Sequence, residues 1–220
     1  SFGLSTTCTC YVHVVNYLCT VAVSRDRMPI VELCGRHSGE PCLLASYLAG
    51  ADRALIAEVP FDAERLLELL RADKAANPSN YAVLTVSEGA HEIGVEPVET
   101  GEADAVGNRK LGGIGARISD LIRARTDGRA VYQALGYLMR SGAPDALDQL
   151  VAQNFATLAC EQLLSGRTGL MTAVVGGRYT VVSLDRLGEG VRRVSVDRFY
   201  DSEAYRPKID RIQGLPMFLH

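Results

Sequence analysis

Four polar residues of this sequence follow apolar runs at points where a strand is expected to end, and their types suit an anionic ligand. Arg36 follows Gly35, which lets a ligand approach the backbone closely, and its planar guanidinium offers paired donors to a phosphate. A carboxylate such as that of Glu88 accepts hydrogen bonds from sugar hydroxyls, and Tyr137 and Arg140 follow a further apolar run. Together they predict a ligand with phosphate and hydroxyl groups. Taken singly, each is explained equally well by a surface ion pair or a helix cap.

The elements that must position these residues alternate between short apolar strands and amphipathic helices. This alternation is typical of an α/β fold with a parallel, helix-covered sheet, which binds ligands beyond the carboxyl ends of its strands. A hairpin with strands at 169–175 and 179–184 follows, and the tail from residue 192 is expected to be irregular. The other strands are predicted over 29–33, 53–58, 81–86 and 130–135, and the helices over 11–23, 38–49, 62–76, 114–125 and 145–164.

Composition and charge narrow the classes of function. The chain of 220 residues is 47% apolar and 22% charged, which is typical of a globular protein and not of a disordered or collagen-like one. Its net charge of −3 offers no basic surface for nucleic acid, so no nucleic-acid partner is expected. The longest apolar run, 11–23, is interrupted by polar residues and lacks the basic flank of a signal peptide, so no membrane span is predicted.

The six cysteines favour a cytoplasmic protein with reduced thiols. They include no CxxC pair, and most lie in apolar surroundings, which is typical of buried thiols in a reducing compartment. Cys8 and Cys10, with His13, leave a metal site open as an alternative. No second pair of ligands with zinc spacing follows, so no metal ligand is predicted.

Several segments, in order along the whole chain, resemble the phosphofructokinase family. The segment at 31–39, VELCGRHSG, resembles the family pattern VEVMGRxxG, and the one at 86–90, VSEGA, is similar to a strand end of the family. Each match alone is weak, whereas the ordered set is specific. The remaining matches are AGAD at 49–52, AEVPFD at 57–62, LGGIG at 111–115, LGYLMRSGAP at 135–144 and GLPMFL at 214–219.

The resemblance implies a role for each matching residue. Glu88 would hold sugar hydroxyls, Tyr137 takes a place where many members have His or Tyr, and Arg140 would bind the 6-phosphate of fructose 6-phosphate. Arg27 would reach the same phosphate in the site of a neighbouring subunit, which implies a homo-oligomer. Arg36 would be catalytic, because it would stabilise negative charge on the transferring phosphoryl group.

The chain also departs from the family pattern at the sugar site. Gly35 would let the sugar lie close to the backbone, but Cys34 stands where the family has methionine, so a sugar contact is expected to weaken. Val131 stands where the family has a second phosphate-binding arginine. Arg129 is left open as its substitute after a local shift.

The resemblance further implies that the phosphoryl donor binds mainly outside this chain. The family's glycine-rich donor loops and its catalytic aspartate (in the TIDND segment) would precede Ser1, so Mg²⁺ and ATP or pyrophosphate would be held by an N-terminal half or a second chain. The LGGIG segment at 111–115 is interpreted as a helix-entry turn. Residues 1–137 would form the fructose 6-phosphate-binding domain, and 138–220 would be a helix, hairpin and tail packing on the N-terminal donor-binding domain.

Three hypotheses about function follow. In the first, the chain is part of a 6-phosphofructokinase and binds fructose 6-phosphate for phosphoryl transfer to its 1-hydroxyl, giving fructose 1,6-bisphosphate in glycolysis. In the second, it is a non-catalytic sugar-phosphate-binding or regulatory subunit derived from such an enzyme, which Val131 and Cys34 favour. In the third, it is a different α/β sugar-phosphate enzyme with chance similarity.

Overall fold

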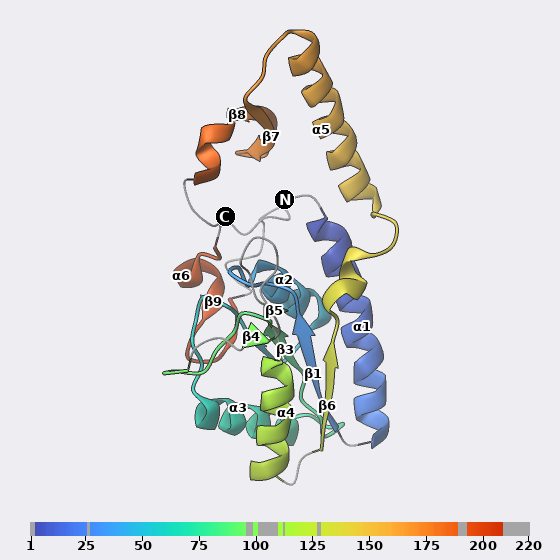
Figure 1. Cartoon of the computed structure of the whole chain (residues 1–220). Coiled ribbons are helices and arrows are strands. Elements are labelled where there is room, and N and C mark those ends of the chain that lie inside the picture. Colours follow the sequence, from blue (N-terminus) through green and yellow to red (C-terminus); the bar gives the residue numbers. More distant parts are fainter. Residues whose placement is uncertain are drawn as a thin grey trace.

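A four-stranded parallel sheet forms the centre of the protein (Figure 1). Its strand order is β2 (Arg53–Leu55), β3 (Leu84–Ser87), β1 (Arg27–Leu33) and β6 (Arg129–Ala134). The helices between them confirm the predicted α/β fold class. The computed structural model describes residues 3–25, 27–95, 99–100, 110–111, 113–126, 129–188 and 193–208.

Helices cover both faces of this sheet. α1 (Leu4–Arg25) and α2 (Glu40–Ala49) pack on one face, while α3 (Ala63–Ala76) and α4 (Ile114–Arg125) pack on the other. The alternation along β1 supplies both cores: Ile30 faces α3 and α4, and Val31 faces α1 and α2. The central strands are therefore buried on both sides, as their apolar sequence predicts.

Local signals explain where the helices begin and end. Asp62 caps α3, because its carboxylate accepts a hydrogen bond from the backbone N–H of Arg65 at 2.8 Å. α2 ends at Gly50, whose φ of 64° lies in the left-handed region that glycine adopts without strain. β2 is shorter than predicted, since residues 56–58 leave the sheet, and β3 begins at Leu84 and not at residue 81.

The first helix is longer than the predicted range of 11–23. α1 has the length and composition of a membrane span, which the interrupted apolar run at 11–23 does not reveal. In the structure its Tyr11 and Val15 are fully buried against α2 and the sheet, whereas Tyr17 and Val21 are exposed. Length and composition alone are weak evidence for a membrane helix, because a core helix of a soluble protein meets the same limits.

A helix and a hairpin extend away from the sheet after β6 (Figure 1). Their apolar side chains are mostly half-buried or exposed, and the one fully buried residue of α5 is Asp148. Phe155 and Tyr179 join helix and hairpin through an edge-to-face ring contact. The elements are η1 (Gly136–Arg140), α5 (Ala146–Leu164), β7 (Leu170–Val175), β8 (Arg178–Ser183) and η2 (Leu184–Gly188).

The beginnings of α1 and α5 are joined by shared capping groups. The carboxylate of Asp148 accepts hydrogen bonds from the N–H of Gly3 at 2.7 Å and from the N–H and hydroxyl of Thr6 at 2.7 and 2.6 Å. Asp145 caps α5 through the N–H of Asp148 at 2.9 Å and also accepts the hydroxyl of Ser5 at 2.6 Å. Each helix N-terminus thus receives carboxylates that stabilise its unpaired N–H groups.

The tail returns to the sheet, which corrects two predictions. Residues 193–208 contain α6 (Val196–Phe199) and the antiparallel pair β9 (Tyr200–Asp201) and β10 (Arg206–Pro207), so this part is not irregular. Its apolar side chains join the core beside α3, so residues 193–208 belong to the sheet domain and not to the unit predicted to follow residue 137. The segment 94–107 lies mostly outside the described residues, apart from β4 (Glu99–Thr100), which pairs with β5 (Lys110–Leu111).

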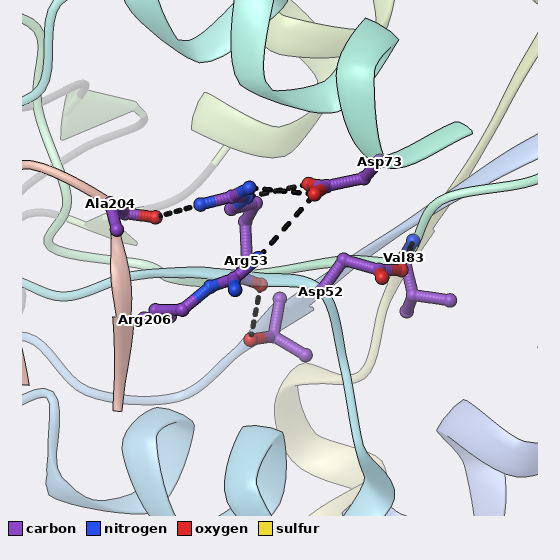
Figure 2. Close-up of polar contacts among 7 residues, drawn as sticks. Asp52, Arg53, Asp73, Val83, Ala204 and Arg206 are labelled. Atoms are coloured by element: carbon purple, nitrogen blue, oxygen red, sulfur yellow. Dashed lines mark hydrogen bonds and ion pairs between the residues drawn. The ribbon is translucent and has the colours of Figure 1, made fainter. Parts of the chain in front are cut away.

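A buried ion pair fastens the tail to the sheet edge (Figure 2). Arg53 at the start of β2 contacts both carboxylate oxygens of Asp73, at 2.5 and 2.6 Å, and donates to the carbonyl of Ala204 at 2.5 Å. The backbone N–H of Ala54 donates to the carbonyl of Tyr205 at 2.8 Å. The tail therefore pairs with backbone groups along β2, a strand at the edge of the sheet.

Candidate sugar-phosphate site

The turn after β1 is held by the end of β3. The carbonyl of Gly35 accepts hydrogen bonds from the hydroxyl of Ser87 at 2.6 Å and from the N–H of Gly89 at 3.3 Å. The N–H of Gly35 donates to Oε1 of Glu88 at 3.3 Å. Two strand ends that are 52 or more residues apart in sequence thus form one polar surface at the carboxyl edge of the sheet.

Two glycines of this surface have no room for a side chain. A Cβ on Gly35, whose φ is 148°, would lie 2.5 Å from the hydroxyl oxygen of Ser87. A Cβ on Gly89 would lie 2.1 Å from the carbonyl oxygen of Arg36. The backbones after β1 and β3 therefore pack directly on each other, which keeps Glu88 beside the turn.

Cys34 is held from the other face of the sheet by Tyr11, a residue that no motif identifies. The Tyr11 hydroxyl accepts the N–H of Cys34 at 2.8 Å and donates to its sulfur at 2.7 Å. Two further thiols lie deeper, where burial raises the pKa of both Cys8 and Cys42 to about 12. These two thiols are therefore protonated at neutral pH, whereas Cys34 is half-exposed at the end of β1.

Arg36 and Glu58 lie near the same edge but differ in what they contact. Arg36 is half-buried and directly follows the turn that Glu88 contacts. Glu58 follows β2, and its carboxylate accepts the N–H of Gly39 at 2.9 Å and the N–H of Val194 at 2.9 Å. We therefore assign Glu58 a structural role, since it holds the start of α2 and the tail together.

The last two predicted residues follow the neighbouring strand. Tyr137 and Arg140 belong to η1, which begins at Gly136 directly after β6. The backbone N–H of Leu135 continues the ladder by donating to the carbonyl of Glu32 in β1 at 3.0 Å. The backbone thus brings both residues to the edge that carries Gly35, while their side chains lie outside the described part of the chain.

Arg27 is not brought to this edge. It begins β1, six residues before Leu33, so about 20 Å of strand separates it from Leu33, which precedes the turn at Gly35. Its register partner in β6 is Arg129, and in a parallel pair such partners lie side by side. The buried Nε of Arg27 finds no acceptor among the residues described. Val131 pairs with Pro29, two positions further along the same strands.

Residues 113–115 of the glycine-rich segment form the start of α4, in agreement with its interpretation as a helix-entry turn. The buried carboxylate of Glu32 accepts the N–H of Gly113 at 3.0 Å, the N–H of Gly115 at 2.9 Å and the hydroxyl of Tyr132 at 3.0 Å. Burial and the adjacent carboxylate raise the pKa of Tyr132. Because a carboxylate already occupies this helix N-terminus, the turn has a structural role.

The described part of the chain contains no cluster of side chains that could bind Mg²⁺. There, no three His, Cys, Asp or Glu side chains lie together as a metal ion requires. Cys8 and His13 of the alternative metal site differ in environment, since Cys8 is buried and His13 is exposed on α1.

A comparison with models of known protein families identifies the family of this chain. The model described as "Phosphofructokinase" matches residues 1–163. The chain belongs to the phosphofructokinase family. The match confirms the resemblance seen in the sequence motifs, and it includes the turn at Gly35, Glu88 and the start of η1.

The curated relatives of this chain include enzymes named as pyrophosphate-dependent and enzymes named as ATP-dependent. The pyrophosphate–fructose 6-phosphate 1-phosphotransferase of Amycolatopsis methanolica is 33% identical over 208 residues, covering 93% of this chain and 60% of that protein. The ATP-dependent 6-phosphofructokinase of Corynebacterium efficiens is 28% identical, covering 93% of this chain and 59% of its own length. The chain thus spans about 60% of the length of these curated relatives.

Solved structures support the fold. The pyrophosphate-dependent phosphofructokinase of Marinobacter aquaeolei superimposes with a TM-score of 0.72 at 18% identity, covering 96% of this chain and 52% of that chain. The phosphofructokinase of Saccharomyces cerevisiae gives a TM-score of 0.63 at 18% identity, covering 84% and 22% respectively. At such identities the likeness concerns the fold alone.

Proposed function

We propose that this chain is the sugar-phosphate-binding part of a cytoplasmic 6-phosphofructokinase. It binds fructose 6-phosphate for phosphoryl transfer to the 1-hydroxyl, giving fructose 1,6-bisphosphate in glycolysis. The observation that carries the proposal is the turn at Gly35, where backbone and the carboxylate of Glu88 meet within 3.3 Å at the carboxyl edge of a parallel sheet. This edge is where such sheets bind ligands.

Each residue of the edge has a proposed role. The carboxylate of Glu88 accepts hydrogen bonds from sugar hydroxyls, and Gly35 and Cys34 let the sugar lie against the backbone. Tyr137 contacts the sugar and Arg140 binds the 6-phosphate. Arg36 stabilises the charge of the transferring phosphoryl group, since an arginine stays protonated and offers a planar pair of donors.

Arg27 is proposed to act in a homo-oligomer. Its distance from Gly35 along β1 supports a role in the site of a neighbouring copy rather than in its own. Its register partner Arg129 supports the proposal, because two guanidinium groups side by side at one strand end suit a phosphate. Arg129 would thereby substitute for the second phosphate-binding arginine of the family, whose position is occupied by Val131 in this chain.

The phosphoryl donor, ATP or pyrophosphate with Mg²⁺, is proposed to bind to an N-terminal half or a second chain. That partner would also supply the base that takes the proton of the 1-hydroxyl. Two observations support such a partner. A two-stranded hairpin is marginally stable by itself, and α5 has no fully buried apolar residue with which to form a core. The helix and hairpin of 138–188 would pack on the donor-binding domain.

Thermal unfolding with and without sugar phosphate tests this proposal. Fructose 6-phosphate should raise the midpoint of unfolding, while fructose and inorganic phosphate at equal concentration should not. Glu88→Gln should remove most of the shift, and the matched exposed change Glu68→Gln in α3 should leave it unchanged. A sugar-phosphate shift of the same size for both variants would contradict the role of Glu88, and no shift with the unchanged protein would contradict the proposed substrate.

A second function, a non-catalytic sugar-phosphate-binding or regulatory subunit, is favoured by Val131. An apolar side chain two positions from Arg129 on β6 provides no charge for phosphate. An assay for fructose 1,6-bisphosphate separates the two functions, with ATP and pyrophosphate tried in turn. Binding of fructose 6-phosphate without product from either donor would favour the regulatory subunit.

A further inference from the structure

Tyr11 contacts the sugar-binding turn twice from the core of the protein. Its hydroxyl accepts the N–H of Cys34 at 2.8 Å and donates its own proton to the sulfur of Cys34 at 2.7 Å. The ring is fully buried between α1 and the sheet. A hydroxyl that both accepts and donates within one residue has a fixed orientation, so it fixes Cys34 in turn.

The hydrogen bonds continue from Cys34 to the group proposed to hold the sugar. The next residue, Gly35, donates its N–H to Glu88 and accepts hydrogen bonds at its carbonyl from Ser87 and Gly89. The backbone at 34–35 is therefore held by α1 on one side and by the end of β3 on the other. A displacement of Cys34 would move the N–H of Gly35 and with it the carboxylate of Glu88.

We propose that Tyr11 is a positioning residue for fructose 6-phosphate. Through Cys34 it sets the orientation of the turn at Gly35 and hence of the Glu88 carboxylate. This inference rests on the proposed function, because Glu88 is the group proposed to accept the sugar hydroxyls. Burial raises the pKa of Tyr11 far above its ordinary value, and the nearby Cys34 adds to the shift, so the hydroxyl remains a donor.

The pair also explains why a short side chain stands at position 34. Methionine, the residue of the family pattern, reaches further than cysteine. The Tyr11 hydroxyl lies 2.7 Å from the Cys34 sulfur, so a longer side chain in this direction would displace the ring or the turn. The sizes of the side chains at positions 11 and 34 are thus coupled, because a larger side chain at one position requires a smaller one at the other.

Tyr11→Phe tests the inference, with Tyr200→Phe as its matched control. Both tyrosines are buried and both lose one hydroxyl, but that of Tyr200 donates to the carbonyl of Ala54 in β2 at 2.7 Å, whereas that of Tyr11 bonds to Cys34 in the turn. Isothermal titration should show that Tyr11→Phe weakens fructose 6-phosphate binding roughly three- to tenfold, because the N–H of Cys34 loses its acceptor. Tyr200→Phe should bind within about twofold of the unchanged protein, although it lowers the unfolding midpoint.

A second measurement does not depend on the sugar. The rate of Cys34 alkylation by iodoacetamide, followed on its peptide by mass spectrometry, should rise with pH as the thiolate forms. Tyr11→Phe should shift this profile to higher pH, because the lost O–H donor stabilises the thiolate, and Tyr200→Phe should leave it in place.

The outcomes separate the inference from the proposed function. If the unchanged protein does not bind fructose 6-phosphate, the proposed function fails, whatever the alkylation profiles show. If it binds, equal affinities for the unchanged protein and Tyr11→Phe overturn the positioning role. Equal weakening by both Tyr→Phe changes also overturns it, since loss of stability would then account for the effect. An alkylation profile that does not move overturns the hydrogen bond on which the role depends.

Discussion

At the scale of single residues, the candidate site depends on backbone packed against backbone. Gly89 is not one of the glycines with a positive φ, so glycine is required there for a purely steric reason. A Cβ at this position would lie 2.1 Å from the Arg36 carbonyl oxygen. Gly50 presents the opposite case, with a φ of 64° and no atom within 4 Å of an added Cβ. The two positions distinguish lack of space from backbone strain.

Gly89→Ala is expected to damage both stability and sugar binding. The added methyl forces the turns after β1 and β3 apart, which should lower the free energy of unfolding by about 1–3 kcal/mol. Fructose 6-phosphate should then give little or no thermal shift. Gly50→Ala should lower stability by about 1 kcal/mol through its left-handed φ and keep the full ligand-induced shift. Urea unfolding with and without the sugar phosphate measures both effects, and equal ligand shifts in the two variants would contradict the steric account.

Sequence patterns predict part of this site for a clear physical reason. Gly35 and Glu88 lie next to strands whose parallel pairing brings their ends together, so the pattern of strands was sufficient to predict that they meet. Tyr11 lies in a helix on the other face of the sheet and reads as an ordinary apolar core residue. Its role depends on a hydroxyl reaching a backbone group 23 residues away, for which no local pattern exists.

At the scale of elements, the helical periodicity at 62–76 predicted its helix, whereas the structure of the tail was not predicted. Asp62 with the leucines that follow predicts α3 to within a residue, because cap and periodicity are both local. The apolar residues of the tail, among them Phe199 and Tyr205, have no regular spacing. They become core residues through contacts with β2 about 150 residues earlier, which no local pattern records.

Breaking the ion pair between Arg53 and Asp73 is expected to release the tail. Asp73→Ala would leave a buried arginine without its carboxylate, which costs about 3–5 kcal/mol of unfolding free energy. The exposed pair of Arg123 and Asp120 offers the control, and Asp120→Ala should cost less than about 1 kcal/mol. Chemical denaturation measures the difference, and limited proteolysis should cut the tail first in Asp73→Ala. Similar losses of unfolding free energy in both variants would contradict the proposed role of the Arg53–Asp73 ion pair in holding the tail.

The cap of α5 should make stability depend on pH in the acid range. The N–H of Asp148 and the hydroxyl of Ser5 hold the pKa of Asp145 below its ordinary value. The folded pKa is lower than the unfolded one, so this contribution is present above the unfolded pKa and is lost as pH falls through the folded pKa. Asp145→Ala should cost about 1 kcal/mol at neutral pH. That difference should shrink below about pH 4, where the carboxylate takes up its proton.

Asp145→Ser separates the cap from the charge. Serine also accepts a backbone hydrogen bond at the start of a helix, so it should restore much of the stability at neutral pH. It carries no titrating carboxylate, so the acid-dependent part should disappear. A thermal unfolding series from pH 3 to 7 (about the range in which a carboxyl group titrates) compares the three proteins, and a constant difference across it would contradict the assignment to Asp145.

At the scale of the whole molecule, apolar surface is concentrated on the part beyond the sheet. Leu163 and Leu164 end α5 with 67% and 89% of their surfaces exposed, and Leu187 after the hairpin is 63% exposed. Adjacent exposed leucines such as Leu163 and Leu164 are typical of association surfaces. The sheet domain, by contrast, has continuous cores on both faces of its sheet.

The chain is therefore expected to associate in solution. Size-exclusion chromatography with light scattering should give a mass above the 23.7 kDa of one chain, or losses to aggregation. Leu163→Glu together with Leu164→Glu should lower the apparent mass, because charges on this surface oppose its burial. A monomer at every concentration tested, for the unchanged chain, would count against an association surface at α5.

The attachment of the tail to β2 also sets the order in which the protein can be completed during its synthesis. Arg53 leaves the ribosome far ahead of its carbonyl partner at Ala204, which lies 151 residues later. At about 5–20 residues per second, this delay is roughly 8–30 s. During that time the edge of β2 and the guanidinium of Arg53 remain exposed to solvent, because their partners in the tail have not yet been synthesised. A nascent chain of this protein thus carries an open sheet edge until Ala204 and Tyr205 have been made.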